Sequence, residues 1–80
     1  MKIEIIAYGI AKDIINGPSL SMDVVEAVDV GTVRKILLSN YPALKGLASL
    51  QLAVNEEYVN DDFVLKENDE VVIIPPVSGG

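Results

Sequence analysis

The residues with the clearest capacity for chemistry stand at the end of the chain, in the segment Pro75, Pro76, Val77, Ser78, Gly79 and Gly80. Each proline fixes φ and lacks an amide donor, so the pair should stop strand pairing and hold the chain extended. Glycine has no Cβ, so the narrow channel of a partner can close around the last two residues. The pattern predicts a protruding tail whose reactive group is the main-chain carboxylate of Gly80.

The composition removes most other routes to catalysis. The chain has no cysteine and no histidine, which excludes thiol nucleophiles, catalytic imidazoles, disulfides and the usual zinc sites. Asp61, Asp62, Glu67 and Asp69 could suggest a calcium loop, but the glycine and the spacing of such a loop are missing. We therefore predict no metal site, no bound cofactor and no catalytic side chain.

The net charge of −6 bears on partners and location. Phosphate binding relies on clustered Lys and Arg, so a nucleic-acid partner is not expected. Acidic residues crowd residues 56–70, where Lys66 is the sole base, and this region is either a solvated face or an interaction surface. No apolar run approaches the roughly 18 residues of a membrane span, and no leader is recognisable. We expect a cytoplasmic protein with no membrane partner.

The body that must hold the tail opens with a strand and a short helix. Polar and apolar residues alternate over residues 2–5, and the apolar run continues to Tyr8, which predicts a strand with one buried face. Ile10, Ile14 and Ile15 recur at helical spacing, and Asn-Gly-Pro at residues 16–18 should end that helix. The β-branched residues over 22–28 predict a second strand, paired with the first.

The main helix follows. Thr32 can cap it through its hydroxyl, and Tyr41 should end it, because a residue before proline is pushed out of the α region. Arg34 and Lys35 are expected to face water. A shorter helical turn is predicted over residues 43–47.

The last third predicts further strands. Alternation over residues 50–54 indicates a third strand, a brief strand should follow at 58–59, and Phe63 and Leu65 are expected to enter the core. Residues 70–74 end in four β-branched apolar residues, a run that suits an interior strand covered on both faces. We place this strand at the centre of the sheet, parallel to the first strand.

This order of elements, with one main helix across a mixed sheet, predicts the α+β architecture known as the β-grasp or ubiquitin-like fold. Residues 1–74 should form the β-grasp domain, and residues 75–80 an extended C-terminal tail. The length of 80 residues allows one domain and one small core.

The residues from 54 onward resemble a known family. Their marks are Val54-Asn55, a spaced Leu65, Asp69-Glu70-Val71 and the tail itself, and together they closely resemble the small, sulfur-carrier subunit of molybdopterin synthase. Tyr8-Gly9 followed by Lys12-Asp13 is also similar to this family, in which an Arg-Glu pair is more usual than Lys12-Asp13. Thiamine-pathway sulfur carriers share the fold and the Gly-Gly end but typically pass from the first strand into a tight hairpin. The predicted first helix therefore favours the molybdopterin branch.

The resemblance implies a carrier without catalytic side chains of its own. A ubiquitin-E1-like enzyme would adenylate Gly80 with ATP, and a sulfur-donating enzyme would supply the sulfur for a thiocarboxylate. Insertion of the tail into the large synthase subunit would then bring this sulfur to the pterin precursor at high effective concentration. ATP would serve the activating enzyme, and the carrier itself would bind no cofactor.

Residues outside the tail are candidates for partner contacts. Tyr8, Ile74 and Val77 could form an apolar docking patch, although Ile74 is expected in the core and both roles stay open for Tyr8. Lys12 could contact a partner, without the planar guanidinium that Arg would offer. Two alternatives remain: a thiamine-type or protein-conjugating ubiquitin-like carrier, and a β-grasp binding module in which the tail is incidental.

Overall fold

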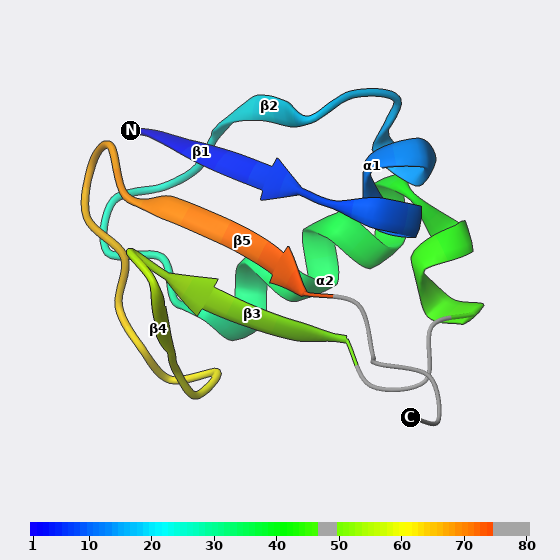
Figure 1. Ribbon diagram of the computed structural model, residues 1–80. Coiled ribbons are helices and arrows are strands. Elements are labelled where there is room, and N and C mark those ends of the chain that lie inside the picture. Colours follow the sequence, from blue (N-terminus) through cyan, green and yellow to red (C-terminus); the bar gives the residue numbers. More distant parts are fainter. Residues whose placement is uncertain (47–49, 75–80) are drawn as a thin grey trace.

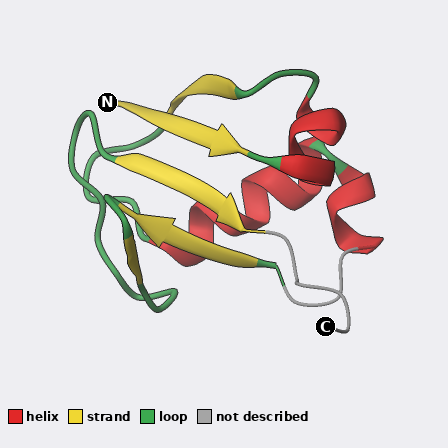
Figure 2. Ribbon diagram, in the orientation of Figure 1, coloured by secondary structure: helices red, strands yellow, loops and turns green. Residues whose placement is uncertain are grey.

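The computed structural model describes residues 1–46 and 50–74 of the chain. In this part of the chain, five strands form one sheet, and α2 crosses one face of it (Figure 1 and Figure 2). The elements in chain order are β1 (Lys2–Ala7), α1 (Gly9–Ile15), β2 (Ser19–Asp23), α2 (Val30–Asn40), the 3-10 helix η1 (Pro42–Gly46), β3 (Gln51–Val54), β4 (Glu57–Tyr58) and β5 (Glu70–Ile74). The predicted β-grasp fold is confirmed.

The sheet has the strand order β2-β1-β5-β3-β4, so β5 lies at its centre. β5 runs parallel to β1, with Ile5 opposite Val71, and antiparallel to β3, with Leu52 opposite Ile73. Both the central position of this strand and its parallel pairing with the first strand are confirmed. The root of the predicted tail, Ile74, thus belongs to a strand that is paired on both sides.

The core lies between the sheet and α2. Alternation along β1 turns Ile3, Ile5 and Ala7 toward α2, which contributes Val33 and Leu37 from successive turns. The remaining core side chains are Ala11, Ile15, Met22, Val28, Val30, Leu44, Leu52, Val54, Leu65, Val71 and Ile73. They come from every element except β4, so the whole body is tied to one core.

β2 lies three residues earlier than predicted. The prediction of a strand over residues 22–28 is wrong because the register with β1 runs from Ile6 opposite Ser19 to Lys2 opposite Asp23. Beyond β1 and β2, Val24 still exchanges two backbone hydrogen bonds with Met1, at 2.9 and 2.8 Å. The chain then enters a loop in which Ala27 adopts a positive φ of 61°. The pairing partner, rather than β propensity, sets where the strand ends.

The start of α2 also differs from the prediction. The N-cap is Asp29, whose Oδ1 accepts a hydrogen bond of 2.8 Å from the backbone amide of Thr32. The hydrogen bonds with Thr32 favour the ionised carboxylate and hold the pKa of Asp29 below its ordinary value. The predicted cap by the hydroxyl of Thr32 is therefore wrong: α2 begins at Val30, so Thr32 is its third residue and supplies the amide that Asp29 caps.

The segment between β4 and β5 is bonded to the region where α2 begins. The amide of Val30 donates to the Phe63 carbonyl at 2.9 Å, and the amide of Leu65 donates to the Val28 carbonyl at 2.8 Å. Leu65 is buried, as predicted, but the side chain of Phe63 is 40% exposed, so its predicted place in the core is wrong. Val64, which forms an isolated bridge with Asp29, is 52% exposed, so Leu65 is the residue of this segment whose side chain enters the core.

Candidate functional site

The candidate site begins where β5 ends. The tail residues predicted to carry the chemistry, Pro75, Pro76, Val77, Ser78, Gly79 and Gly80, lie outside the described residues. The described part shows what surrounds their root. Parallel strands end at the same edge of a sheet, and Ala7 is opposite Ile73, so the next residues along the two strands, Tyr8 and Ile74, are neighbours at that edge.

Tyr8 marks the passage from β1 to α1. Its backbone is still extended, with φ −127° and ψ 160°, and its side chain is 62% exposed. Its carbonyl accepts hydrogen bonds from the amides of Ala11 and Lys12, at 3.1 and 3.4 Å. Lys12 is exposed one helical turn further along, on the same side of α1. The fold thus places Tyr8 on the surface beside the tail root and exposes Lys12 one turn further along the chain, and the contact of either with a partner stays a prediction.

Ile74 does not lie in the core. Val71 and Ile73 are fully buried under α2, whereas Val72 and Ile74 point to the opposite face and are half-buried. The expectation of a core position for Ile74 is wrong, as is that of a strand covered on both faces, because the described helices cover one face of the sheet (Figure 2). The consecutive apolar residues of β5 therefore alternate between the face that the helices cover and an open face that is also apolar.

The open face carries an apolar row that the sequence predictions missed. The register places Ile6 beside Val72, Val72 beside Ala53, and Ala53 beside Tyr58. Neighbouring strands are about 4.8 Å apart, so these four side chains, named the apolar row, form one line across four strands. Tyr58 is 69% exposed, Ile6 and Val72 are half-buried, and Ala53 between Val72 and Tyr58 is buried, with 5% of its surface exposed. The sequence did hold a signal for this row. Both β1 and β5 carry apolar residues on consecutive positions, and the sequence predicts a single helix long enough to cover a sheet, so one of the two apolar faces had to stay open.

Acidic side chains occupy the other end of the same face. Glu4 and Glu70 are direct neighbours on β1 and β5, and Glu4 Oε2 accepts a hydrogen bond of 3.0 Å from Ser21 Oγ. Lys2 stands opposite Asp23 at the end of the ladder between β1 and β2. Within residues 1–46 and 50–74, no group of three carboxylates is close enough to hold a metal ion. The open face therefore divides into an apolar part toward the tail root and a mainly acidic part away from it.

No helix in the described ranges is long and apolar enough to span a bilayer. The geometry is that of a ubiquitin-like β-grasp protein: one face of a mixed sheet is open, and the central strand ends at an edge of that face. The chain belongs to the ThiS family, which it matches over residues 8–80, and within it to the molybdopterin synthase sulfur carrier subunits.

Similarity to known proteins extends over the whole chain. The molybdopterin synthase sulfur carrier subunit of Caenorhabditis elegans is 36% identical over 83 residues, which cover 100% of this chain and 99% of the nematode protein. The structure of a putative molybdopterin converting factor, subunit 1, from Pyrococcus furiosus has a TM-score of 0.87 at 21% identity, covering 96% of this chain and 99% of that one. A complex of subunits 1 and 2 of the molybdopterin-converting factor from Helicobacter pylori contains a chain with a TM-score of 0.71 at 25% identity, and both chains are covered completely. The family predicted from the sequence is confirmed.

Proposed function

We propose that this molybdopterin synthase sulfur carrier works through the main-chain carboxylate of Gly80. The observation that carries the proposal is the full-length match at 36% identity to a sulfur carrier subunit, in a fold whose central strand leads directly into the Pro-Pro-Val-Ser-Gly-Gly segment. The chain has no cysteine that could carry the sulfur on a side chain. This supports the main-chain carboxylate as the group that is converted to an acyl-sulfur species.

The chemistry needs activation because a carboxylate has no good leaving group. A carboxylate oxygen of Gly80 would attack the α-phosphorus of ATP on an E1-like enzyme, with pyrophosphate leaving, to give an acyl adenylate. A sulfide equivalent from the sulfur-donating enzyme would displace AMP and leave a thiocarboxylate. Its sulfur would attack an electrophilic carbon of the pterin precursor in the large subunit and displace an oxygen substituent from that carbon. Water would then cleave the acyl–sulfur bond, which restores the carboxylate and leaves the sulfur on the pterin as a thiolate. ATP is a substrate of the partner enzyme, and we assign no resident cofactor to the carrier.

The open face of the sheet is the proposed docking surface for the large synthase subunit. Apolar side chains on an uncovered face commonly mark a protein interaction site. The apolar row, exposed at Tyr58 and half-buried at Ile6 and Val72, lies on the same face as Ile74, at the tail root. The structural relative from Helicobacter pylori is itself one half of a complex between subunits 1 and 2. Tyr8 and Lys12 would extend this contact around the edge of the sheet. The proposal keeps the predicted cytoplasmic location, since ATP, activating enzyme and synthase must share one compartment.

Intact-mass analysis provides the first test. The full chain is incubated with the activating enzyme, ATP and the sulfur donor, and we expect the mass of one oxygen-for-sulfur replacement. A chain lacking Gly80 should gain nothing, with an unchanged melting temperature, because the core is built from residues 3–73. A wild-type rate of sulfur transfer by the shortened chain would refute the role of Gly80.

Reconstitution separates this function from its alternatives. The thiocarboxylated chain is mixed with the large subunit and the pterin precursor, and dithiolene formation is followed together with the return of the carrier to its original mass. Loading followed by transfer only to a thiazole precursor, or by covalent attachment to lysines of other proteins, would instead indicate the thiamine-type or the conjugating carrier. Normal cellular function of the chain lacking Gly80 would indicate a plain binding module.

A further inference from the structure

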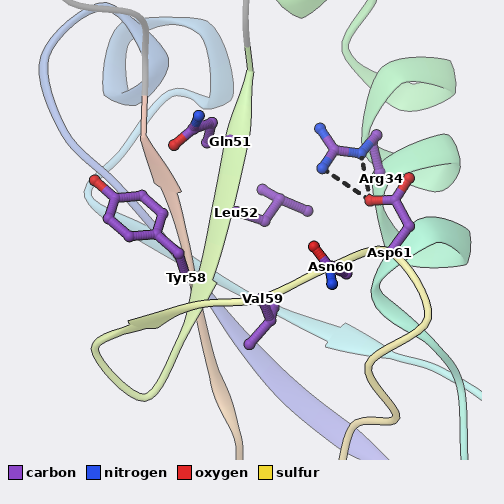
Figure 3. Close-up of a pocket in the computed structure, with 7 residues that line it drawn as sticks. All are labelled: Arg34, Gln51, Leu52, Tyr58, Val59, Asn60 and Asp61. Atoms are coloured by element: carbon purple, nitrogen blue, oxygen red, sulfur yellow. Dashed lines mark hydrogen bonds and ion pairs between the residues drawn. The ribbon is translucent and has the colours of Figure 1, made fainter.

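Arg34 links three parts of the chain near the tail root. From α2 its Nε and Nη2 donate to Oδ1 of Asp61 at 3.2 and 3.0 Å, and its Nη1 donates to the carbonyl of Leu50. Its side chain is only 25% exposed, so the predicted position of Arg34 in water is wrong. Figure 3 shows the guanidinium and Asp61 on the α2 side of β3. Val33 and Leu37, both fully buried, fix α2 in the core on either side of this residue.

The hydrogen bond from Arg34 to Leu50 lies at one end of the hydrogen-bonded ladder between β3 and β5. Gln51, the next residue, pairs with Ile74, the last described residue before the tail. β4 is two residues long and pairs with the last two residues of β3, away from this end. A cavity of about 720 Å³ opens where a longer β4 would lie (Figure 3). Arg34 therefore supplies a hydrogen bond to the outer edge of β3 at a point that β4 does not reach.

The opposite end of the ladder has a clamp of its own. The amide of Asn55 donates to the Glu70 carbonyl at 3.0 Å, and its side-chain Oδ1 accepts from the Glu70 amide at 3.2 Å. Its Nδ2 donates to Asp69 Oδ1 at 3.0 Å. This end of the ladder is the pair Val54 and Val71, at the start of β5. Side chains thus hold both ends of the pairing between β3 and β5. Asn55 acts at the end far from the tail, and Arg34 acts at the end where the tail begins.

We propose that Arg34, oriented by Asp61, is a positioning residue that fixes the direction in which the tail leaves β5. The inference rests on the proposed sulfur-carrier function of Gly80. A planar guanidinium can serve a carboxylate and a backbone carbonyl at once, which a lysine ammonium does less well. A change at Ile74 alters the point from which the tail starts, and a misplacement of a reacting atom by about 1 Å can cost roughly 100-fold in rate.

The test measures single-turnover sulfur transfer from the thiocarboxylated carrier as the concentration of large subunit is varied. For Arg34→Ala we expect the rate at saturation to fall by roughly 10- to 100-fold, with an unchanged half-saturating concentration, because the apolar row is intact. Arg34→Lys can hold one of the two acceptors and should give an intermediate rate. Lys35→Ala removes a neighbouring exposed cation and should transfer at the wild-type rate.

A second comparison separates positioning from stability. Asn55→Gly removes the side-chain bonds at the far end of the ladder, and glycine accepts the positive φ of 50° found there. This variant should lower the melting temperature at least as much as Arg34→Ala but leave the saturated transfer rate unchanged. Residue-resolved hydrogen exchange should quicken at residues 51 and 74 in Arg34→Ala, and at residues 54 and 71 in Asn55→Gly.

Two results would overturn the positioning role: an unchanged saturated rate in Arg34→Ala, or an equal loss of rate in Asn55→Gly. The exchange measurement does not depend on sulfur chemistry. A wild-type chain that transfers no sulfur, while both variants show the expected exchange, would refute the proposed function and leave the two clamps of the ladder established.

Discussion

Two neighbouring isoleucines on β5 allow a direct measurement of which face of the sheet is covered. Ile73 is 0% exposed and belongs to the core, whereas Ile74 is half-buried on the open face. Truncation of Ile73 to alanine removes its transfer free energy and leaves a cavity, so we expect a loss of about 2–5 kcal/mol in the free energy of unfolding. The same truncation at Ile74 takes apolar atoms from a partly hydrated site and encloses no cavity, so we expect about 1 kcal/mol or less.

The assay is urea unfolding of wild type, Ile73→Ala and Ile74→Ala, followed by circular dichroism. The midpoints should separate while the slope stays constant, because both variants expose nearly the same area on unfolding. A change of 1 kcal/mol moves the melting temperature of such a domain by about 4–8 °C, so Ile73→Ala should melt roughly 10 °C or more below wild type. Titration with the large subunit should then show weaker binding for Ile74→Ala. Equal destabilisation by the two substitutions would refute the assignment of an open face.

Three further predictions concern the cap of α2, a close approach and the tail. Folding lowers the pKa of Asp29, so its ionised form stabilises the fold above about pH 4, and this contribution is lost as the pH falls through the lowered pKa. The melting temperature of wild type should therefore exceed that of Asp29→Asn by less in acid than at neutral pH. A difference that stays constant with pH would contradict this. A Cβ at Gly31 would lie 3.1 Å from Asp61 Cβ and 3.3 Å from the Asp61 carbonyl, so Gly31→Ala should cost about 1–2 kcal/mol in denaturant unfolding, and an unchanged midpoint would show that Asp61 yields freely. Gly79→Val places a branched side chain where the partner channel must close, so sulfur transfer in the reconstituted synthase should stop, and normal turnover would disprove a tight channel.

The centre of the fold could be predicted because its signal is local and strong. Four consecutive β-branched residues at 71–74 strongly favour a strand, and such uninterrupted apolar runs are typical of interior strands, although only one face of this strand is covered. The parallel pairing with β1 follows from the connection through the main helix. The family marks lie in the same stretch of sequence and in the tail, which explains why the fold and the family were both predictable.

The surface could not be predicted in the same way. Hydrophobicity reports which side chains are apolar but not which face of the sheet another layer covers, and for this reason the position of Ile74 and the apolar row were missed. The partner of Arg34 is 27 residues away in sequence, on a loop whose path is set by hydrogen bonds to the start of α2. No periodicity in either segment indicates that contact.

The position of the tail root has a consequence for how a carrier of this kind exchanges partners. In the proposed function, activation and sulfur transfer both use the same tail, and the apolar row lies on the face that the tail root borders. If both partners dock there, they must bind in turn, and each must release the carrier quickly. An acidic end of the docking face, with Glu4 beside Glu70, favours fast encounter with a basic surface without requiring a large apolar contact. Added salt should then slow association with both partners and change dissociation less, and a salt-independent association rate would show that the acidic end of the face is only a solvated surface.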